Sequence, residues 1–478
     1  MIDERNCLGE LPKGWIWVKV RDVVSNISLT GRKLKQKQYV VSGKLPVVDQ
    51  GQKFIGGYTD REELKVNVVP PVIVFGDHTK IVKYVDFDFV AGADGVKVLK
   101  PLEAFYPRLF YYFLHVIQLP EKGYARHFQF LQKSFIPLPP FNEQVRIVVK
   151  LEELFTRLDA GVEGLQKVKA QLKRYRQAVL KYAFEGKLTE EWRETHKDQI
   201  EPATTLLERI KQERRERLGP KYKELPSIDL SELPELPQSW IWVRLGEVAD
   251  TTSGGTPSRK KKEYYGGRIP WLKSGELKDG AVNVTEESIT EDGLANSSTR
   301  MIPKGTLLIA LYGATVGKLG VLGIDSAVNQ AICAIFPNNG ISRDFLFWYL
   351  RKYRDELLNI RKGGAQPNIS QDVVRNTVLP LPSIEEQQTI VDEVESRMYL
   401  IKEVETVLEK SLKQADRLRQ GILKQAFEGK LVPQDPSDEP AEKLLERIKA
   451  ERAKSKAEKD INKKKIKPKQ LELSTYVK

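Results

Sequence analysis

A long internal repeat is the feature that most constrains this chain. Residues 136–189 align without a gap on residues 379–432, at a constant offset of 243, and 22 of the 54 positions are identical. Two shorter pairs of matching segments flank this repeat: LPKGWIWV at 11–18 with LPQSWIWV at 236–243, and EPATTLLERIKQER at 201–214 with EPAEKLLERIKAER at 439–452. Each half therefore combines a globular block, a long helix and a short helix, and the function requires two copies of some component.

The long repeat predicts one unbroken helix per half. Each copy follows a proline-rich stop, at 138–140 and 379–382, and then continues without proline to EGKL. Apolar residues recur every seven positions in the same register in both copies: Leu151, Leu158, Leu165, Leu172 and Val179, then Val394, Ile401, Leu408, Ala415 and Ile422. We expect the two helices to pack antiparallel on each other, because the first ends where the second block must begin.

A helix pair of this length has a metric consequence. About 40 residues at 1.5 Å each give a rod of roughly 60 Å. We expect this rod to act as a spacer that carries one block near each end, with the two ends related by a pseudo-two-fold axis. A coiled-coil hairpin that merely joins two domains is the alternative interpretation.

The two globular blocks, residues 11–135 and 236–378, share a layout more than a sequence. Each closes with an aromatic segment, RLFYYFL at 108–114 and DFLFWYL at 344–350, whose spacing predicts a core helix rather than a base-stacking surface. Short β-rich runs alternate with glycine-rich turns, among them Val72–Phe75, Lys97–Leu99, Thr306–Leu311 and Ala331–Phe336. We expect two small α+β domains.

The shorter repeats carry two further predictions. Trp15 and Trp240 stand in matching Trp-Ile-Trp-Val strands, and core packing is the better interpretation of these residues than base stacking. The LLERIK helices at 206–211 and 444–449 show two leucines on one face and an isoleucine three residues on. We therefore expect each short helix to dock on another surface.

Composition limits the partners and the compartment. The net charge is +13, but residues 443–470 alone carry +8, so the charge is weak evidence of a nucleic-acid surface in the rest of the chain. Cys7 and Cys333 cannot form a disulfide framework, and the polar beginning of the chain lacks the apolar stretch of a signal peptide. No apolar run approaches membrane-spanning length. We expect a soluble, cytoplasmic protein without membrane contacts.

Motifs in both blocks resemble one known family. The first block contains QGQKFIGGYTD at 50–60, VIVFGDHTK at 72–80 and FVAGADGVKVLKP at 89–101. The second contains TSGGTPS at 252–258, YYGGRIPWLKSGEL at 264–277, LLIALYGATVGKLG at 307–320, NQAICAIFP at 329–337 and KGGAQPNISQ at 362–371. Together with the paired PLP…EQ…FEGKL helices, these motifs closely resemble the DNA-specificity (S) subunit of type I restriction-modification systems, over nearly the whole chain. The first block has KGYARHFQF at 122–130 where the second has the GGAQPNIS run.

The resemblance implies a function and a set of partners. Each block would be a target recognition domain that reads one half of an asymmetric, bipartite DNA sequence. The long helices would set the separation of the half-sites and dock the modification subunits. The implied partners are double-stranded DNA, two modification (methyltransferase) subunits and restriction (translocase and nuclease) subunits. The short LLERIK helices would dock on the modification subunits. The chain itself would be non-catalytic and without a cofactor, with S-adenosylmethionine, ATP and Mg²⁺ on the partner subunits.

The repeats and the resemblance together predict the organisation of the chain. The fold class is α+β, with two β-rich α/β target recognition domains separated by two long, antiparallel, coiled-coil-like helices. The predicted segments are a first target recognition domain at 1–140, a central helix at 141–189, a linker with a short docking helix at 190–235, a second target recognition domain at 236–382, a C-terminal helix at 383–432 and a basic tail with a short docking helix at 433–478.

Candidate DNA contacts are polar loop residues of the types that read base edges or hold phosphates. In the first block they are Gln50, Gln52, Lys53, Asp77, His78, Lys80, Arg126, His127 and Gln129. In the second block they are Arg268, Lys273, Thr315, Lys318, Asn329, Gln330, Gln366 and Asn368. A candidate phosphate clamp, with a merely solvated loop as the alternative, is the basic run Arg259, Lys260, Lys261 and Lys262.

No motif for catalysis or nucleotide binding is complete in the sequence. Residues 313–318 are one residue too short between the glycines for a phosphate loop, and Leu319 replaces the Ser or Thr that would bind magnesium. Residues 138–141, LPPF, lack the Asn or Asp of an adenine methyltransferase motif, and the four histidines have no metal-ligand spacing. Two alternatives stay open: a self-contained restriction or methylation enzyme, and a repeat-built interaction scaffold that binds no nucleic acid.

Overall fold

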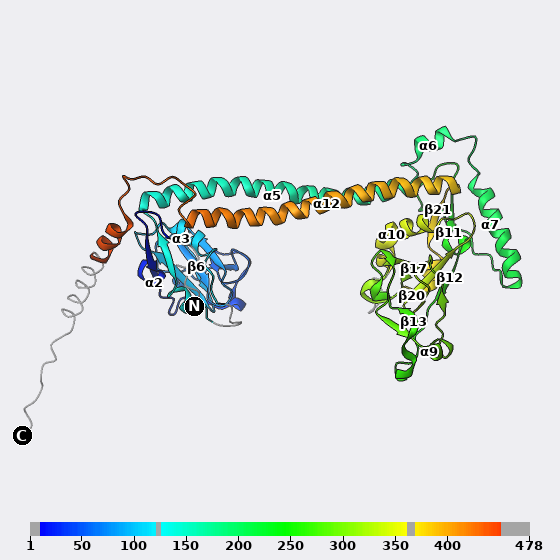
Figure 1. Ribbon diagram of the computed structural model, residues 1–478, viewed down its shortest axis with the longest axis horizontal. Helices are drawn as coiled ribbons and strands as arrows, with labels where there is room; N and C mark the ends of the chain where they lie inside the picture. The colour runs from blue at the N-terminus through cyan, green and yellow to red at the C-terminus, as the bar shows by residue number, and fades with distance from the viewer. Residues whose placement is uncertain (1–9, 121–125, 361–368, 451–478) are drawn as a thin grey trace, which may run out of the picture. The chain divides into compact units, whose positions relative to one another are not determined.

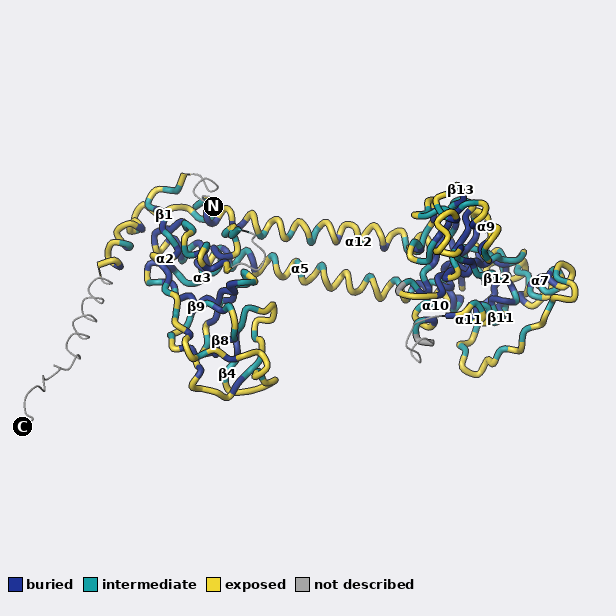
Figure 2. Tube along the Cα trace, turned by 90° about the horizontal axis from the view of Figure 1, so that it is seen from below, coloured by how far each residue is buried: buried dark blue, intermediate teal, exposed yellow. Residues whose placement is uncertain are grey.

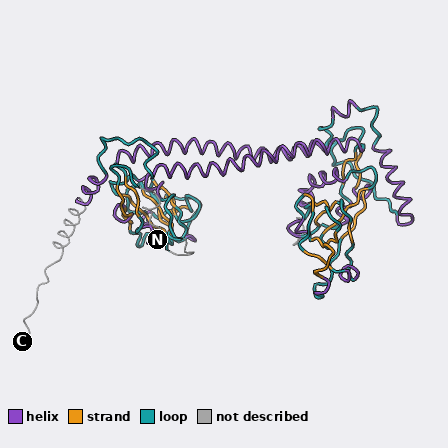
Figure 3. Tube along the Cα trace, in the orientation of Figure 1, coloured by secondary structure: helices purple, strands orange, loops and turns teal. Residues whose placement is uncertain are grey.

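The structure has the predicted α+β fold class (Figure 1, Figure 3). It is a computed structural model that describes residues 10–120, 126–360 and 369–450. The chain divides into two compact units: unit 1, residues 1–165 and 409–478, and unit 2, residues 166–408. Because this division cuts both long helices, it does not test the block and helix boundaries predicted from the sequence.

Each long helix is a single unbroken helix of 44 residues, α5 (Phe141–Phe184) and α12 (Ile384–Phe427), and each ends five residues before the end of its predicted segment. Within unit 1 the first part of α5 pairs with the last part of α12, where Asp159 is bonded to Arg419. Within unit 2 the last part of α5 pairs with the first part of α12, where Arg176 Nη2 lies 2.8 Å from Glu405 Oε2. The predicted antiparallel pairing is therefore present in each unit (Figure 1).

The seam between the long helices is narrow. Its fully buried members are Leu151, Val179, Val394, Ile401, Leu408 and Ile422. Its half-buried members are Leu158, Leu165, Leu172 and Ala415. The predicted heptad positions are thus all buried or half-buried. When two helices pair, each covers only one narrow face of the other. Val168 and Tyr175, which lie beside that face, are therefore 39% and 47% exposed.

The first turn of each long helix is fixed to its block by the same amide contact. Gln144 Nε2 donates to Ala104 O at 2.8 Å, and its counterpart Gln387 donates to Gly340 O at 3.0 Å. Each amide oxygen in turn accepts from the backbone N–H two residues further along the same loop. The repeated Glu-Gln pair is therefore an attachment point of the helix.

The two long helices also end in the same way, each at a glycine of the repeated EGKL segment. Gly186 and Gly429 have φ angles of 74° and 69°, the left-handed conformation in which glycine closes a helix. A Cβ atom on Gly186 would lie 2.4 Å from Pro237, and one on Gly429 would lie 2.3 Å from Pro12. The EGKL turn of each helix therefore packs against the repeated Leu-Pro segment that begins a block.

Unit 1 contains the first block, whose three sheets have the strand orders β1-β10, β2-β9-β6-β7 and β3-β8-β4-β5. The strands are β1 (Ile16–Lys19), β2 (Val24–Ile27), β3 (Lys33–Leu34), β4 (Leu45–Val48), β5 (Gly57–Thr59), β6 (Val72–Gly76), β7 (Val82–Val85), β8 (Val90–Gly92), β9 (Val96–Pro101) and β10 (Phe135–Leu138). The short helices are α2 (Val20–Val23), α3 (Pro107–Phe113) and α4 (Phe128–Leu131). Two of the predicted β runs lie in β6 and β9.

Unit 2 contains the second block, whose sheets have the orders β11-β21, β12-β20-β17-β18-β14 and β15-β13-β19-β16. The strands are β11 (Ile241–Arg244), β12 (Ala249–Ser253), β13 (Tyr265–Leu272), β14 (Gly280–Val282), β15 (Glu287–Ile289), β16 (Met301–Ile302), β17 (Leu307–Ala310), β18 (Leu319–Leu322), β19 (Ser326–Val328), β20 (Ile332–Pro337) and β21 (Val378–Leu381). The helices are α6 (Glu190–Thr195), α7 (Ala203–Leu218), α8 (Leu245–Val248), α9 (Glu291–Ala295), α10 (Arg343–Ile360) and α11 (Gln371–Arg375). The other two predicted β runs lie in β17 and β20.

The two blocks share a sheet plan although their sequences diverge. Strands β2, β9, β6 and β7 correspond to β12, β20, β17 and β18, with antiparallel pairing throughout. In the second sheet, β4 pairs antiparallel with β5 and parallel with β8, as β13 does with β15 and β19. The aromatic segments form core helices as predicted, with buried Leu109, Phe110 and Phe113 in α3 and buried Phe345, Leu346 and Tyr349 in α10 (Figure 2).

The two short repeated helices pack on blocks of their own chain. Leu206 and Ile210 of α7 are fully buried in the core of unit 2. The matching Leu444 and Ile448, in the helical residues 441–450, are buried in the core of unit 1. The prediction that these helices dock on modification subunits through their apolar faces is therefore wrong, because the chain itself already covers those faces.

Among the described helices, none is long and apolar enough to cross a bilayer.

Candidate nucleic-acid interface

Four segments of unit 1 meet in what we call loop cluster 1: residues 49–56 after β4, 77–81 after β6, 93–95 after β8 and 126–128, which end at the first residue of α4. Gln50 Oε1 accepts from His78 N at 3.3 Å. Asp77 N donates to Gly95 O at 2.7 Å, and Asp77 O accepts from His127 N at 2.9 Å. Eight of the nine candidate residues of the first block lie in this cluster, and Gln129 follows it in α4.

A buried ion pair fixes the longest loop of cluster 1. Lys83, on β7, is 4% exposed, and its Nζ donates to Lys53 O at 2.6 Å and lies 3.5 Å from Asp49 Oδ1. Burial lowers the pKa of Lys83, although Asp49 favours the charged form. Burial, reinforced by Asp49, also raises the pKa of Tyr39. The loop is held from within the block, while Gln52 and the side chain of Lys53 remain exposed.

Asp77 and His127 hold cluster 1 together from inside. Their exposures are 3% and 1%. Asp77 Oδ1 accepts from Phe128 N at 2.8 Å, and His127 Nδ1 lies 3.0 Å from Asp77 O. Both side chains are thus buried and bonded within the cluster, and their predicted contacts with DNA stay predictions. Their neighbours Arg126 and Gln129 are exposed.

Unit 2 gathers equivalent segments in loop cluster 2. They are residues 253–258 from the last residue of β12, 311–318 between β17 and β18, 329–331 between β19 and β20, and 369–371 up to the first residue of α11. Leu311 donates through its N–H to Ala331 O at 2.8 Å and accepts from Ile369 N at 2.9 Å. The side chains of Thr256 and Gln330 are bonded to each other. Residues 369–371 thus contact the hairpin end in unit 2 as residues 126–128 do in unit 1.

Four of the candidates in the second block lie in cluster 2, namely Thr315, Lys318, Asn329 and Gln330. Lys273 follows Leu272, whose carbonyl accepts from Asn329 N at 2.9 Å, so it lies beside the cluster. Arg268 is exposed on β13. Gln366 and Asn368 lie outside the described residues.

Several basic candidates of the second block are paired with carboxylates of the same block. Arg259 Nη1 lies 2.7 Å from Glu287 Oε2, and Lys273 Nζ lies 3.1 Å from Glu287 Oε1. Lys318 Nζ lies 3.0 Å from Asp279 Oδ2. The hydrogen bond with Glu287 raises the pKa of Arg259. Nearby carboxylates reduce the positive potential that these side chains offer to phosphates.

The basic run at 259–262 therefore splits into two kinds of residue. Arg259 is paired and also lies over the ring of Tyr265, 4.4 Å from its centroid. Lys261 Nζ donates to Tyr264 Oη at 2.8 Å. Lys260 and Lys262 are exposed, so they remain the members of the run best placed for a phosphate.

Two exposed or polar members of the clusters were not predicted from the sequence. Phe54, next to Lys53 in cluster 1, is 47% exposed, and its ring meets Phe87 edge-on at 6.0 Å. Thr256, in cluster 2, is bonded to Gln330. The only sequence signal for either residue is its place in a glycine-containing turn.

The clusters are suited to binding by hydrogen bonds and charge. Gln52 and Gln129 offer amide donors and acceptors, and Lys53 and Arg126 offer cations, which are the groups that read base edges and hold phosphates. Within the described part of the chain, no three His, Cys, Asp or Glu side chains lie close enough together to hold a metal ion.

Two solved structures share this fold. One, from a study of complex assembly and conformational transition of the type I R-M system, aligns with a TM-score of 0.59 at 20% identity and covers 88% of this chain and 100% of that chain. The other, the HsdS subunit from Thermoanaerobacter tengcongensis, aligns with a TM-score of 0.51 at 20% identity and covers 88% of this chain and 98% of that chain.

Sequence comparisons identify the family. The specificity subunit of the type I restriction enzyme EcoR124I/EcoR124II from Escherichia coli is 25% identical over 396 residues, covering 79% of this chain and 85% of that subunit. The EcoBI specificity subunit from Escherichia coli is 29% identical, covering 70% of this chain and 68% of that subunit. The family profile described as type I restriction modification DNA specificity domain matches residues 12–172 and 237–412, once in each half of the repeat. The chain therefore belongs to the family of type I restriction-modification DNA-specificity subunits.

Proposed function

We propose that this chain recognises an asymmetric, bipartite DNA target for a type I restriction-modification complex. Each block reads one half-site through its loop cluster, and the paired helices set the distance between the half-sites. The observation that carries this proposal is the occurrence of two loop clusters on one sheet plan with different side chains. The two blocks share a sheet plan, but their loop clusters carry different polar side chains. They are therefore better suited to two different half-site sequences than to a symmetric target.

Catalysis belongs to partner subunits in this proposal. Two modification subunits, one for each half of the repeat, supply S-adenosylmethionine and the methyltransferase site. Restriction subunits supply ATP, Mg²⁺ and the nuclease. The complex forms on double-stranded DNA in the cytoplasm, and the specificity subunit directs the other subunits to the target.

A repeat-built scaffold that binds no nucleic acid is the second candidate. The observation in its favour is that Arg259, Lys273 and Lys318 are paired with carboxylates of their own block. The exposed Gln52, Lys53 and Arg126 of cluster 1 count against it, because their side chains are of the types that read base edges and hold phosphates.

Exchanging one block tests the proposal. Residues 236–378 are replaced by the second block of another family member, and the chain is combined with its modification subunits for methylation mapping. Only one half of the methylated sequence should change, because each block reads its own half-site. The reciprocal exchange of residues 11–135 is the control and should change only the other half. Loss of specificity at both halves would show that the blocks are not independent.

A second experiment separates recognition from catalysis. The purified chain alone should transfer no methyl group to DNA in the presence of S-adenosylmethionine, and activity should appear when the modification subunit is added. Methyl transfer by rigorously partner-free protein would support the self-contained enzyme instead.

A further inference from the structure

The turn between β17 and β18 carries two of the candidate DNA contacts of cluster 2, Thr315 and Lys318. Lys318 N donates to Thr315 O at 2.9 Å, which closes the turn. Gly313 and Gly317, within the turn, both have φ angles of 75°, the left-handed conformation that favours glycine. These features give the turn its shape, while its orientation within the block depends on contacts with other elements.

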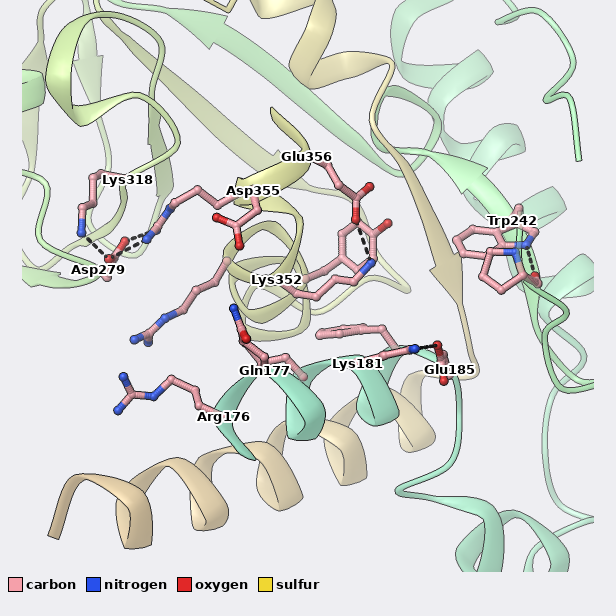
Figure 4. Close-up of a pocket in the computed structure, with 16 residues that line it drawn as sticks. Arg176, Gln177, Lys181, Glu185, Trp242, Asp279, Lys318, Lys352, Asp355 and Glu356 are labelled. Carbon is pink, nitrogen blue, oxygen red and sulfur yellow. Dashed lines mark hydrogen bonds and ion pairs between the residues drawn. The ribbon is translucent and has the colours of Figure 1, made fainter. Parts of the chain in front are cut away.

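Asp279 holds one end of this turn. It directly precedes β14, which pairs parallel with β18. Its N–H donates to Leu319 O at 2.9 Å, and its Oδ1 accepts from Leu319 N at 3.1 Å. Its Oδ2 accepts from Lys318 Nζ at 3.0 Å, and Figure 4 shows these two side chains where they line a pocket of unit 2. One aspartate thus binds the backbone that follows the turn and the side chain of its last residue.

Arg354 of α10 completes this arrangement. Its Nε donates to Gly317 O at 2.8 Å, its Nη1 donates to Asp279 Oδ2 at 3.0 Å, and its Nη2 donates to Asp279 Oδ1. Two parallel bonds to one carboxylate fix the direction of a guanidinium as well as its position. The side chains of Arg354 and Asp279 are only 18% and 11% exposed. We call these two residues the turn clamp.

The turn clamp leaves Lys318 with part of its positive potential. Burial by itself would raise the pKa of Asp279, but the hydrogen bonds from Arg354 and from Leu319 N lower it. Asp279 is therefore charged, and it shares its one negative charge between two cations. Lys318 is the most exposed of the three groups, with 42% of its side chain accessible. A partly exposed ammonium in a group of net positive charge is suited to a phosphate.

The turn clamp also connects the turn to the long helices, because α10 packs on both of them within unit 2. Tyr349 of α10 packs edge-on against Phe184 of α5, with ring centroids 5.1 Å apart. Trp348 Nε1 donates to Glu395 Oε1 of α12 at 3.4 Å. Arg354 lies further along the same helix. Side-chain contacts of a single helix therefore set the position of the turn relative to the helix pair of its unit.

Unit 1 fixes its equivalent turn, residues 77–81, in a different way. In that unit α3 ends at Phe113, and Gln118 stands where the alignment of the two aromatic segments places Arg354. The turn is joined instead to a neighbouring loop, since Thr79 Oγ1 donates to Gln50 O at 2.9 Å. Among the residues that the structure describes, the helix-borne turn clamp is therefore a feature of the second block.

We propose that the turn clamp is a positioning device for recognition of the second half-site. Arg354 and Asp279 do not touch the DNA. They hold the turn so that Thr315 meets a base edge and Lys318 meets a phosphate. The inference rests on the proposed function and deepens it, because it names residues that determine specificity without contacting the target. Recognition of the first half-site should not depend on them.

The test removes the turn clamp and measures the two half-sites separately. The full-length Arg354→Met variant is assembled with the modification subunits and assayed on DNA in which one base pair of either half-site has been altered. The preference for the intact second half-site should fall roughly tenfold. The preference for the intact first half-site should stay the same. Methylation rates on the altered DNA, relative to the intact target, provide the measurement.

Two further variants separate positioning from charge and from folding. Arg354→Lys keeps the positive charge and loses the parallel bonds, so it should also relax the second half-site while its thermal unfolding matches that of the unchanged chain. It decides the question by the same assay if Arg354→Met does not fold. Arg354→Met combined with Asp279→Asn should relax the second half-site no further than Arg354→Met alone, because residues that act as a unit are not additive.

Arg343→Met is the matched control. Arg343 lies on the same helix, and its Nη1 donates to Gly305 O at 3.4 Å, a turn carbonyl outside cluster 2. The variant removes a comparable bond between a guanidinium of α10 and a glycine carbonyl. It should leave the preference for both half-sites unchanged.

Four outcomes would overturn the inference. An unchanged preference for the second half-site in folded Arg354→Met would show that the turn clamp positions nothing. Full preference in Arg354→Lys together with a loss in Arg354→Met would assign the effect to charge alone. An equal loss in Arg343→Met would assign it to the general stability of α10, and an equal loss at both half-sites would assign it to assembly of the complex. Failure of the unchanged chain to direct methylation to a bipartite target would refute the proposed function itself, and it would be seen before any variant is compared.

Discussion

The two units anchor their long helices with the same hydrogen bond in different surroundings. Trp15 Nε1 donates to Glu143 Oε2 at 2.9 Å in unit 1, and Trp240 Nε1 donates to Glu386 Oε2 at 2.7 Å in unit 2. Both tryptophans are buried, as predicted, and both carboxylates lie in the first turn of a long helix. The bond joins the entrance of each block to its helix.

The second oxygen of each carboxylate distinguishes the units. Glu386 Oε1 accepts from Thr189 Oγ1 at 2.7 Å and from Arg193 Nε at 3.1 Å. Glu143 Oε1 is buried without a described partner of standard hydrogen-bond geometry, and burial raises the pKa of this carboxyl, although Trp15 and Arg146 favour its charged form. The chain after α12 has Val432 where the chain after α5 has Thr189. The repeat preserves the anchor, and the segment that follows α5 gives the carboxylate of Glu386 an additional hydroxyl and guanidinium donor.

Shortening both helices tests what the two units share. Removing residues 158–164 together with 401–407 keeps both apolar registers and shortens the helix pair by roughly 10 Å. At about 3.4 Å per base pair, the half-sites should move roughly three base pairs closer. Because the change also rotates the blocks about the DNA axis, some variants should lose binding altogether. Methylation maps of those that bind should show unchanged half-sites and a shorter gap, and an unaltered gap would refute the spacer role.

Neutralising the two anchors should sharpen the difference between the units. Glu386→Gln leaves Arg193 without its buried counter-charge, and we expect the free energy of unfolding to fall by about 3 kcal/mol. Glu143→Gln keeps an acceptor for Trp15 and removes a charge that burial disfavours, so the change should be below about 1 kcal/mol. Urea unfolding, with hydrogen exchange to locate the unit that opens, measures both. Equal losses would mean that the two anchors are equivalent.

The pH dependence of the Glu143→Gln variant isolates the contribution of the buried Glu143 carboxyl to stability. Because the folded-state pKa of Glu143 is raised, its favourable contribution is fully present below the ordinary pKa of 4.5 and is lost as the pH rises through the folded-state value. The variant should therefore gain stability relative to the unchanged chain as the pH increases above 4.5. Thermal unfolding of the two proteins across this range provides the measurement. A constant difference would show that Glu143 is not destabilised by its burial.

Substitution of two exposed lysines of unit 2 should give the smallest effect, a change in the salt dependence of DNA binding. Lys260→Ala with Lys262→Ala removes two candidate phosphate contacts, so the slope of log binding constant against log salt should fall by about 0.9 for each lysine. The half-site sequences should remain unchanged, because phosphate contacts carry no sequence information. Binding titrations of the assembled complex at several salt concentrations measure the slope. An unaltered slope would assign these residues to a solvated loop.

The helices could be predicted because their signals are local. The proline stops, the heptad register and the glycine of EGKL fixed both long helices to within a few residues, and the aromatic spacing identified α3 and α10 as core helices. The sequence also indicated most of the polar residues of cluster 1 as candidate DNA contacts. It did not separate buried Asp77 and His127 from exposed Arg126 and Gln129, because polar side chains in one loop look alike until their partners are known.

The sequence by itself determined that two equal helical frames carry two unequal blocks, because a gapless repeat constrains length and register directly. Only the tertiary structure decided which surfaces meet. Periodicity shows that Leu206 and Ile210 must be buried but not that their own block covers them. Charge composition likewise does not reveal that Arg259 lies beside Glu287. Such contacts join residues far apart in the chain, and they depend on the sheet topology that brings the loops together.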